Sequence, residues 1–374
     1  MIQAQFVCKQ QHEVLFDRID SLMSETTAVA HSENSRGFLV QKLLMRSVEE
    51  LQAGTVGADV AVQQISSGKL ESEWSIAIVG SVAFNRYSVN RDMIARGHRT
   101  AGMTFLFPIL AQSERSHFRQ RQLREGQLLL QNSDAIIDHH AADNLLQYSL
   151  GIKENTLIEQ AEIQYDSSLC EALRHQRPLA VSPLRFKSFT NWLLHHTDHC
   201  IGAPAFAASK AIDPGFNRFD SKKMHRVVAD GFDPRELEQE AIDRFLAILS
   251  EAMDADYVDP DAPTRRDIFR KADDLMRANL MVPLSASQIC KAIGCSRRTL
   301  YYSFGALFDM TPLVYYKSMR MNAARQALLN NKDGEKIYQI AARFGFPHAG
   351  QFSIDYTKLF GESPSVTMHG KKAS

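Results

Sequence analysis

Two arginines and two tyrosines lie together on one face of a predicted helix that begins after Ser296. The apolar residues Leu300 and Phe304 of this helix fall on the opposite face, at helical spacing. The outward-facing residues are Arg297, Arg298, Tyr301 and Tyr302. An arginine can donate two hydrogen bonds to guanine, and a tyrosine can bond a phosphate or pack on a thymine methyl group. These four residues are therefore candidates for contacts with double-stranded DNA.

The sequence around this helix occurs twice. Gly294 matches Gly345 at a separation of 51 residues, and five further pairs match at 52. The five pairs are Leu300/Phe352, Phe304/Tyr356, Leu307/Leu359, Phe308/Phe360 and Pro312/Pro364. Each copy has a short helix, a glycine turn and a second helix, and in such a helix-turn-helix unit the first helix braces the second in the major groove. We therefore predict two units, joined by a long helix from Pro312 to about Leu329.

The second copy has its own candidate contacts, which are His348, Gln351 and Lys358. Gln351 can pair with adenine, and we expect Lys358 to lie closer to the phosphate backbone. Two such helices in one chain should lie on one face of DNA about one helical turn, roughly 34 Å, apart. The alternative is a helical repeat that only packs, and the exposed arginines and tyrosines argue against it.

Charge is distributed unevenly about Pro260. The whole chain has 43 basic and 43 acidic residues. Residues 261–374 contain 17 Lys and Arg against 9 Asp and Glu, a net +8, which leaves −8 for residues 1–260. A basic segment attached to an acidic one is expected when one half of a chain contacts a polyanion, although ribosomal and membrane-surface proteins share this pattern.

The hydrophobic pattern indicates two domains and a linker. Residues 254–263 contain two prolines and four aspartates, which predicts an exposed linker. Short β-type runs punctuated by glycine occupy residues from about 55 to 150, and helical spacing follows from about 155 to 253. We therefore predict an α+β protein with an effector-sensing or dimerising domain over residues 1–253 and an all-α domain over residues 264–374.

An arginine cluster in the predicted β-rich region is a candidate effector site. Arg115, Arg119 and Arg121 would share one face of a strand, where they could hold a phosphate or carboxylate. The alternative is a solvated strand face paired with Glu114 and Glu125.

Histidines and cysteines provide a weaker case for a metal site. The helical i,i+4 pairs are His195 with His199 and His196 with Cys200, and a further pair of neighbours is His139 and His140. No third ligand follows at a fixed spacing, so an ordinary polar helix face is favoured. We predict neither a metal nor a cofactor.

Several classes of protein are disfavoured by what the sequence lacks. Five cysteines are scattered without a C-x-x-C pair, and we find no leader and no run of about 18 apolar residues, so we expect a cytoplasmic protein with no membrane segment. P-loop, G-x-S-x-G, H-E-x-x-H and G-x-G-x-x-G motifs do not occur, so we predict no catalytic residues and no enzyme. The alternatives are a DNA-binding domain fused to a DNA-repair-like enzyme and an architectural DNA binder.

The second copy and the helix before it carry a resemblance to a known family. The second copy is Ile337-x-x-Ile340-Ala341-x-x-x-Gly345-Phe346-x-x-x-x-x-Phe352-x-x-x-Tyr356-x-x-x-Phe360-Gly361-x-x-Pro364, and the helix is Pro312-x-x-Tyr315-x-x-x-x-Arg320-x-x-x-Ala324-x-x-x-Leu328. Over about 105 residues this resembles the AraC/XylS family of bacterial transcription regulators. Ser296-Arg-Arg-Thr-Leu300 and Gly350-Gln-Phe352 are most similar to regulators of the ethanolamine-operon type.

The resemblance implies a one-component transcription regulator. It implies a cupin-like barrel followed by helices, ahead of the DNA-binding domain. The implied partners are promoter DNA, RNA polymerase, a small-molecule effector, which the arginine cluster would make anionic, and a second copy of the chain. The family commonly has arginine where this chain has Ile354, and longer polar side chains where it has Ala349 and Gly350. We therefore expect the first copy to carry most of the base readout.

Overall fold

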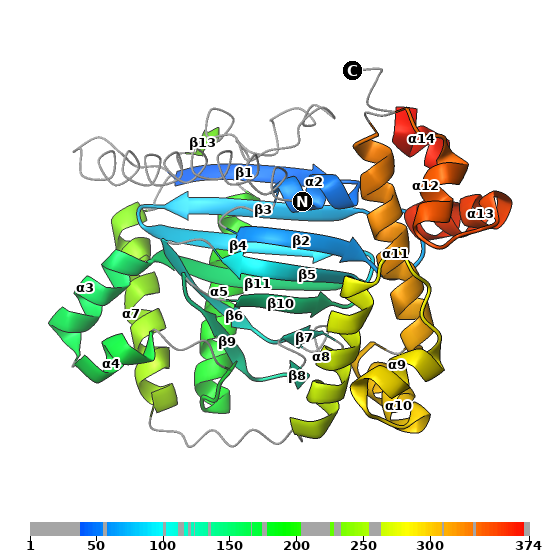
Figure 1. The fold of residues 1–374 in the computed structure, drawn as a ribbon. Coiled ribbons are helices and arrows are strands. Elements are labelled where there is room, and N and C mark those ends of the chain that lie inside the picture. Colours follow the sequence, from blue (N-terminus) through cyan, green and yellow to red (C-terminus); the bar gives the residue numbers. More distant parts are fainter. Residues whose placement is uncertain are drawn as a thin grey trace.

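The protein combines an N-terminal β-sheet region with a helical C-terminal region (Figure 1). The computed structural model describes residues 38–54, 58–99, 102–110, 116–118, 121–122, 124–133, 136–165, 167–173, 178–202, 225–227, 233–253, 263–308, 310–331 and 334–369. In this view the C-terminal helices stand at one end of the sheets.

The strands form two antiparallel sheets. The first has the order β12-β9-β6-β11-β4-β3-β1-β13 and the second the order β2-β5-β10-β7-β8. The strands of the first are β1 (Phe38–Met45), β3 (Ser72–Val79), β4 (Val82–Val89), β6 (Met103–Pro108), β9 (Leu128–Gln131), β11 (Leu145–Lys153), β12 (Pro178–Leu179) and β13 (His225–Val227). The strands of the second are β2 (Ala58–Gln64), β5 (Met93–Arg99), β7 (His117–Phe118), β8 (Arg121–Gln122) and β10 (Ile136–Ala141), and the short helix α2 (Val48–Gly54) lies between β1 and β2 in sequence.

The turn between β3 and β4 shows how local sequence builds the first sheet. Val79 pairs with Val82, so Gly80 and Ser81 form a two-residue hairpin turn, and Gly80 has the positive φ of 58° that such turns need. The carboxylate of Glu238 accepts hydrogen bonds from the Ser81 amide at 2.7 Å and from its hydroxyl at 2.6 Å. The left-handed backbone favours glycine here, and a side chain on Gly80 would also displace the carboxylate of Glu238.

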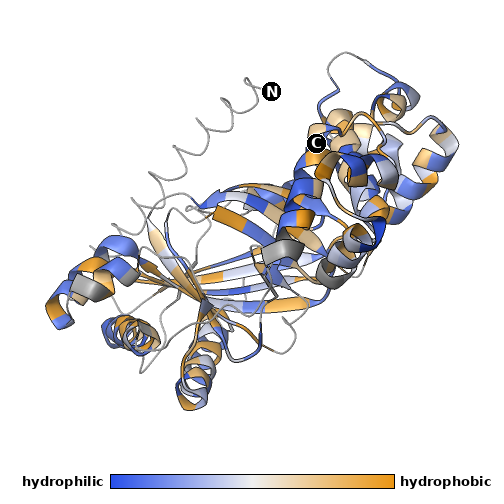
Figure 2. Ribbon diagram, turned by 60° about the horizontal axis from the view of Figure 1, so that its bottom comes forward, coloured by the Kyte–Doolittle hydropathy of each residue, from blue (hydrophilic) through white to orange (hydrophobic). Residues whose placement is uncertain are grey.

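Among the described residues, four helices that follow β11 in the chain share a hydrophobic core with the first sheet. They are α3 (Glu154–Gln164), α4 (Ser167–Ala172), α5 (Pro183–Ile201) and α7 (Pro234–Met253). Ser182 caps α5 by accepting from the Arg185 amide, and Pro183 occupies the first turn. The apolar faces of α5 and α7 and the inner face of the sheet share one core, with Phe84 against Trp192 at 5.7 Å between ring centroids. Figure 2 shows the alternation of hydrophobic and hydrophilic residues that this packing requires.

The described residues of the C-terminal region form seven helices. They are α8 (Pro263–Ala278), α9 (Ala286–Ile293), α10 (Arg297–Phe308), α11 (Pro312–Leu329), α12 (Ile337–Arg343), α13 (Ala349–Phe360) and α14 (Pro364–His369). The long helix expected from Pro312 is α11. The mixed fold, with β-sheets first and helices last, is confirmed.

One strand begins earlier than the sequence predicts, and the predicted linker lies mostly outside the described residues. β1 begins at Phe38, ahead of the β-rich region predicted from about 55, and its FLVQKLLM sequence buries residues from both faces. The expected linker, 254–263, lies outside the described residues except for Pro263, which begins α8. The domain boundary therefore stays a prediction. Among the described helices, none is long and apolar enough to cross a membrane.

Candidate nucleic-acid interface

The pair α9 and α10 meets at a glycine turn. Ser285 caps α9 and exchanges hydrogen bonds with Gln288 in a capping box. Gly294 ends α9 in the left-handed conformation at φ 71°, and its amide donates to the carbonyl of Cys290. Ser296 then caps α10 by accepting from the Thr299 amide at 3.0 Å. These local signals fix where one helix stops and the next begins.

α10 has the inward and outward faces that the sequence predicts. Leu300 and Phe304 are fully buried, and Phe304 packs edge-on against Tyr315 of α11 at 5.2 Å between centroids. The four candidate DNA contacts lie on the other side: Arg297, Arg298 and Tyr302 are exposed, and Tyr301 is half-buried. Nη2 of Arg297 donates to the Tyr301 hydroxyl at 3.5 Å, and this bond raises the pKa of Arg297. The side chains of Arg297 and Tyr301 therefore contact each other on the outer face of α10.

The pair α12 and α13 repeats this arrangement. Phe352, Tyr356 and Phe360 are buried at the positions that match Leu300, Phe304 and Phe308. The candidate contacts His348, Gln351 and Lys358 are all exposed. The repeat in the sequence therefore corresponds to a repeat in burial.

Ile354 and Asp355 lie beside these contacts, where the sequence differs from the family that it resembles. Ile354 is 65% exposed, and Asp355 accepts an ion pair from Lys317 of α11 at 2.6 Å. The outer face of α13 therefore has an apolar residue where the family commonly has arginine.

Gly345, in the turn of the second pair, has less space around it than Gly294 has in the first. Its φ is 74°, and a Cβ there would lie 2.7 Å from Nη1 of Arg320 and 2.8 Å from Cδ of Pro283. That same Nη1 donates to the carbonyls of Phe344 and Gly345 at 3.2 and 3.3 Å. A side chain at Gly294 would meet nothing within 4 Å. The buried arginine of α11 thus ties the second turn to the long helix.

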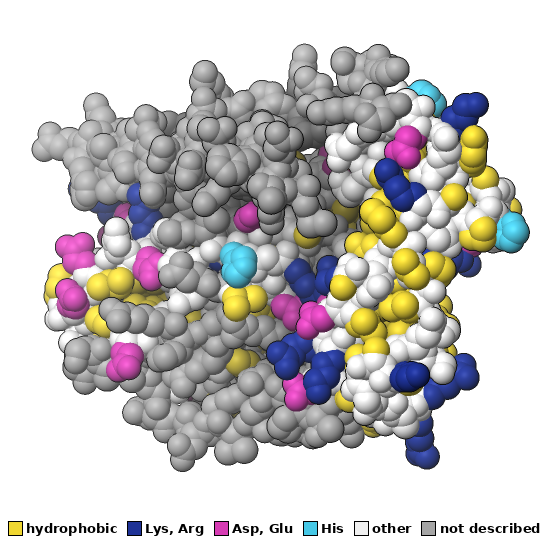
Figure 3. Space-filling model, viewed as in Figure 1, with side chains coloured by type: hydrophobic (Ala, Val, Ile, Leu, Met, Phe, Trp, Pro, Cys, Tyr) yellow, Lys and Arg dark blue, Asp and Glu magenta, His cyan; other side chains and the backbone are white. Residues whose placement is uncertain are grey.

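α11 packs against both pairs at once. Its first half, with Tyr315 and Met319, belongs to the core of α8, α9 and α10, whereas Ala324 and Leu328 belong to the core of α12 and α13. Because one rigid helix carries both pairs, their outer faces are fixed relative to each other. Figure 3 shows Lys and Arg side chains along the outer margin of these helices, away from the sheets.

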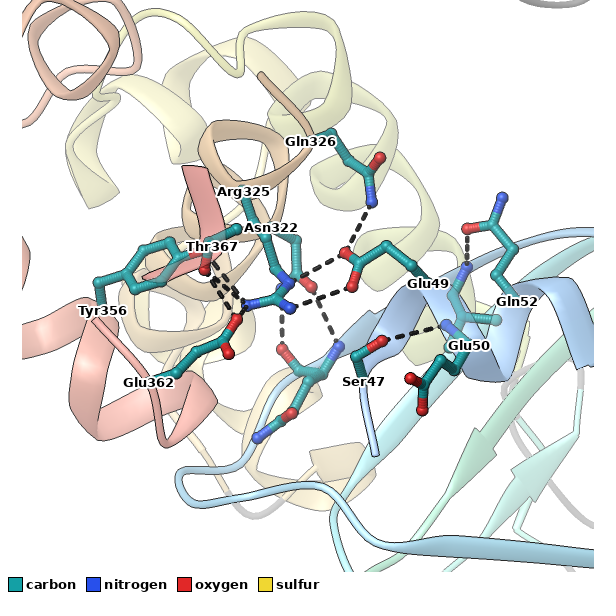
Figure 4. Close-up of polar contacts among 12 residues, drawn as sticks. Ser47, Glu49, Glu50, Gln52, Asn322, Arg325, Gln326, Tyr356, Glu362 and Thr367 are labelled. Atoms are coloured by element: carbon teal, nitrogen blue, oxygen red, sulfur yellow. Dashed lines mark hydrogen bonds and ion pairs between the residues drawn. The ribbon is translucent and has the colours of Figure 1, made fainter. Parts of the chain in front are cut away.

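An ion-pair network joins the sheets to α11 (Figure 4). Arg325 is almost completely buried, and its Nε and Nη2 donate to the two carboxylate oxygens of Glu49 in α2 at 2.9 and 3.0 Å. Its Nη1 donates to Glu362 at 2.7 Å. Burial alone would lower the pKa of Arg325, but the two carboxylates raise it well above its usual range. The guanidinium is therefore permanently charged and fully paired.

Side-chain amides make a second contact beside this network. Asn322 presents its amide to the end of β2, accepting from the Gln64 backbone amide at 3.2 Å and donating to the Gln64 carbonyl at 2.8 Å. The side chain of Gln64 donates to the carbonyl of Leu359 in α13 at 2.5 Å, and the Gly68 amide donates to the carbonyl of Lys358 at 2.9 Å. The C-terminal end of α13 is thus held against the second sheet.

A third contact lies at the other end of the interface. Arg96 of β5 bridges Asp138 of β10, at 2.7 Å, and Asp273 of α8. Asp273 also accepts from Tyr315 at 2.7 Å and from Arg277 at 2.8 Å. Burial raises the pKa of Asp273, yet Arg96 and Arg277 lower it further, so the carboxylate stays ionised. Apolar residues complete the contact, with Ile65 and Ile94 inside the core of α8, α10 and α11.

Sequence reasoning missed these interface residues. Asn322 and Arg325 are polar residues of a helix, and Glu49 lies in the first turn of a short one, so each reads as surface when taken alone. Their partners are 258 and 276 residues away in the chain. The available signal was that Arg320, Asn322 and Arg325 stand among the apolar residues in the middle of a helix.

The other candidate clusters remain predictions. The single strand expected for the arginine cluster is wrong, because β7 and β8 are two strands that pair antiparallel, with Phe118 opposite Arg121. Arg115 and Arg119 lie outside the described residues, as does the side chain of Arg121 in β8, so their role in effector binding stays a prediction. His195 and His199 stack at 6.3 Å between ring centroids on α5. Within the described part of the chain, no group of three or more His, Cys, Asp or Glu side chains could hold a metal ion.

Comparisons with known proteins point to the same C-terminal segment. A helix-turn-helix domain family matches residues 289–370. The probable thc operon regulatory protein of Rhodococcus erythropolis is 36% identical over 104 residues, which are 28% of this chain and 31% of that protein. XylDLEGF operon transcriptional activator 2 of Pseudomonas putida is 29% identical over 101 residues, 27% of this chain and 64% of that protein. A transcriptional regulator of known structure from Chromobacterium violaceum, described as containing an AraC-type DNA-binding domain, is 32% identical over 30% of this chain and 98% of its own, with a TM-score of 0.28.

The C-terminal domain belongs to the AraC family. The resemblance predicted from the sequence is therefore confirmed. The matched segment begins inside α9 and ends just beyond α14, so it contains part of α9, all of α10 to α14 and all seven candidate DNA contacts. The matched segment spans about a third of the length of the thc operon regulatory protein.

Proposed function

We propose that this protein is a sequence-specific DNA-binding transcription regulator of the AraC type. The observation that carries the proposal is the repeated burial pattern of α9–α10 and α12–α13 on a single long helix. Such a pair of helix-turn-helix units can present two recognition helices, α10 and α13, to successive major grooves. Arg298 and Gln351 are suited to bases, and Lys358 to phosphate.

Control by the N-terminal region is the second part of the proposal. Two facing sheets with a cavity between them agree with a cupin-like barrel, and the second sheet contacts both helix pairs. An effector can shift DNA binding only if it binds one arrangement of the two regions better than another. The contacts of Glu49, Gln64 and Arg96 are the groups through which such a preference would act.

The remaining partners follow from the family. We propose that the regulator forms a homodimer through its N-terminal region and contacts RNA polymerase when bound at a promoter. Its relatives include a protein described as an operon transcriptional activator, which supports activation over repression.

Genome-wide DNA selection with the purified full-length protein tests the proposal. The salt concentration must be fixed, since phosphate contacts dominate affinity. We expect an asymmetric site with two short blocks about one helical turn, roughly 34 Å, apart. The matched control is a variant with Arg298 and Gln351 both changed to Ala, which leaves the buried faces of α10 and α13 intact. Selection of no preferred sequence, by the full chain and by residues 255–374 alike, would refute the proposal.

A further inference from the structure

A cavity of about 170 Å³ lies between the two sheets. Strands of both sheets and α2 line it. The wall from the second sheet includes Val60 and Val62 of β2 and Met93 of β5, and the wall from the first includes Phe105 and Phe107 of β6. Most of the lining is apolar. A cavity of roughly 150 Å³ with such walls holds a benzene-sized molecule, so this one accommodates a small organic body.

Arg99, the last residue of β5, lines this apolar cavity. Arg99 is half-buried by its exposed surface, and the burial of its guanidinium among protein atoms lowers the pKa of Arg99 to about 10, which leaves it cationic at neutral pH. Nη2 donates to Oε1 of Gln131 at 2.8 Å, and the guanidinium lies 4.2 Å from the ring centroid of Phe105. Nε has no hydrogen-bond partner among the described residues. Nor does a carboxylate pair with Arg99 in the part of the chain that the structure describes.

Arg99 is the single cation among the described residues that line the cavity, and no acidic residue lies among them. The other titratable nitrogen there belongs to His139. Burial and the neighbouring His140 lower the pKa of His139 to about 4, so its ring is neutral. The contrast with Arg96, on the opposite face of the same strand, is informative: Arg96 has two carboxylates and Arg99 has none.

A buried charge of this kind is costly unless an opposite charge compensates it. An arginine suits a carboxylate best, since its parallel N–H groups match the two oxygens. The neutral polar groups of the lining, such as Gln131 and Ser149, can hydrogen-bond one carboxylate but offer no second cation. A phosphate dianion would therefore be left partly uncompensated.

We propose that this cavity binds a small organic carboxylate, with the carboxylate on Arg99 and an apolar body of about six to eight carbon atoms between the two sheets. Only the identification of this molecule as the effector rests on the proposed function. The binding site itself stands on the cavity and on Arg99.

The same strands carry the cavity wall on one face and the contacts to the DNA-binding helices on the other. In β5, Met93, Ala95 and Arg99 face the cavity, whereas Ile94 and Arg96 contact α8 and its neighbours. In α2, Leu51 lines the cavity and Glu49 holds Arg325. In β2, Val60 and Val62 line it and Gln64 bonds Asn322. A ligand that shifts these elements therefore acts on the interface contacts of Glu49, Gln64 and Arg96.

Calorimetric titration of the full-length protein at pH 7 tests the proposal. The probes are hexanoate and cyclohexanecarboxylate, each compared with its neutral analogue, 1-hexanol or cyclohexylmethanol, and with inorganic phosphate. We expect each acid to bind at least roughly tenfold more tightly than its alcohol, because only the acid pairs with Arg99. Trp74 lines the cavity, so its fluorescence supplies an independent signal of entry.

Arg99→Met removes the charge but keeps an extended side chain, and it should reduce acid binding to the level of the alcohol. Arg124→Met is the matched control, since Arg124 is exposed and does not line the cavity. If Arg99→Met does not fold, Arg99→Lys retains the charge and should keep part of the preference for acids. Equal binding of acids and alcohols by the native protein, failure of both acids to bind, or undiminished acid binding by Arg99→Met would each overturn the proposal. Phosphate binding as tight as that of the acids would overturn the ligand class.

DNA affinity measured in the same samples separates this proposal from the proposed function. Acid binding that leaves DNA affinity unchanged supports the binding site but contradicts the control of DNA binding by this ligand. Acid binding by a protein that selects no DNA sequence supports the site and refutes the regulator.

Discussion

Glu49→Gln is expected to loosen the contact between α2 and α11 without unfolding either region. The substitution keeps the size of the side chain and removes its charge. Arg325 then retains Glu362 as its single carboxylate partner, at 2.7 Å. The C-terminal core stays paired, so the perturbation acts on the contact between the two regions.

The expected magnitude follows from the bonds lost. Glu49 accepts two charge-assisted hydrogen bonds from Arg325, at 2.9 and 3.0 Å. Such bonds contribute about 1.5–3 kcal/mol each in net terms. Glu49 is 23% exposed, and a glutamine can still accept one bond, so we expect a loss of about 1.5–2 kcal/mol. The undocked population should then rise by roughly tenfold to thirtyfold.

Hydrogen exchange of two backbone amides measures this population directly. The amide of Gln64 donates to the Asn322 side chain, and that of Gly68 donates to the Lys358 carbonyl, so undocking exposes both. Their exchange rates should rise by the same roughly tenfold to thirtyfold factor. Amides of the β4–β11 ladder, which is remote from α11, report global opening and should not change.

Glu50→Gln is the matched control. Glu50 is the next residue of α2, and its carboxylate accepts from the Arg46 amide instead of from α11. Exchange at Gln64 and Gly68 that differs by less than about twofold between the two variants would refute the reasoning, and the ion pair would then rank with surface pairs of little net value.

Three further predictions follow from the geometry. Arg298→Ala should cost about 1–3 kcal/mol of DNA binding and relax base preference, whereas Lys358→Ala should weaken binding to all sequences and flatten the salt dependence; titrations with selected and scrambled DNA separate the two outcomes. His139 takes up a proton near pH 6.5 in the unfolded chain but only near pH 4 in the folded protein, so the free energy of unfolding should fall by about 2 kcal/mol from pH 7 to pH 5. In urea unfolding, His139→Asn should lack this part of the pH dependence. Gly345→Ala should destabilise by more than 2 kcal/mol or so in thermal unfolding and Gly294→Ala by only about 1, since both strain the backbone but only the first meets neighbouring atoms; equal losses would contradict this account.

The helical half of the fold was accessible to sequence reasoning because its signals are local. Ser285, Gly294 and Ser296 mark helix ends by their own conformational preferences. Leu300 and Phe352 reveal a repeat because each copy must bury the same face. Nothing beyond a window of about 52 residues was needed to find the two helix pairs.

The contacts between the two regions were not accessible in this way. Asn322 pairs with Gln64 across 258 positions, and no periodicity links them. Arg99 follows Gly97 and His98 at the end of a strand, where an arginine is ordinary, and only the closing of the two sheets removes it from water. The predicted effector cluster drew attention to Arg115 because its arginines are adjacent in sequence, whereas Arg99 is isolated in sequence.

The amide of Asn322 has a consequence for self-association. β2 is an edge strand of the second sheet, and its last residue finds in Asn322 the donor and acceptor that a neighbouring strand would supply. Uncovered edge strands pair readily with other chains. Whatever frees the AraC-type domain therefore also frees the backbone amide and carbonyl of Gln64 at this edge, whereas the Val62 amide of the same strand still donates to Gln52 of α2. Asn322 thus occupies the last hydrogen-bonding position of this edge strand, where an added strand would have to begin, for as long as the two regions stay docked.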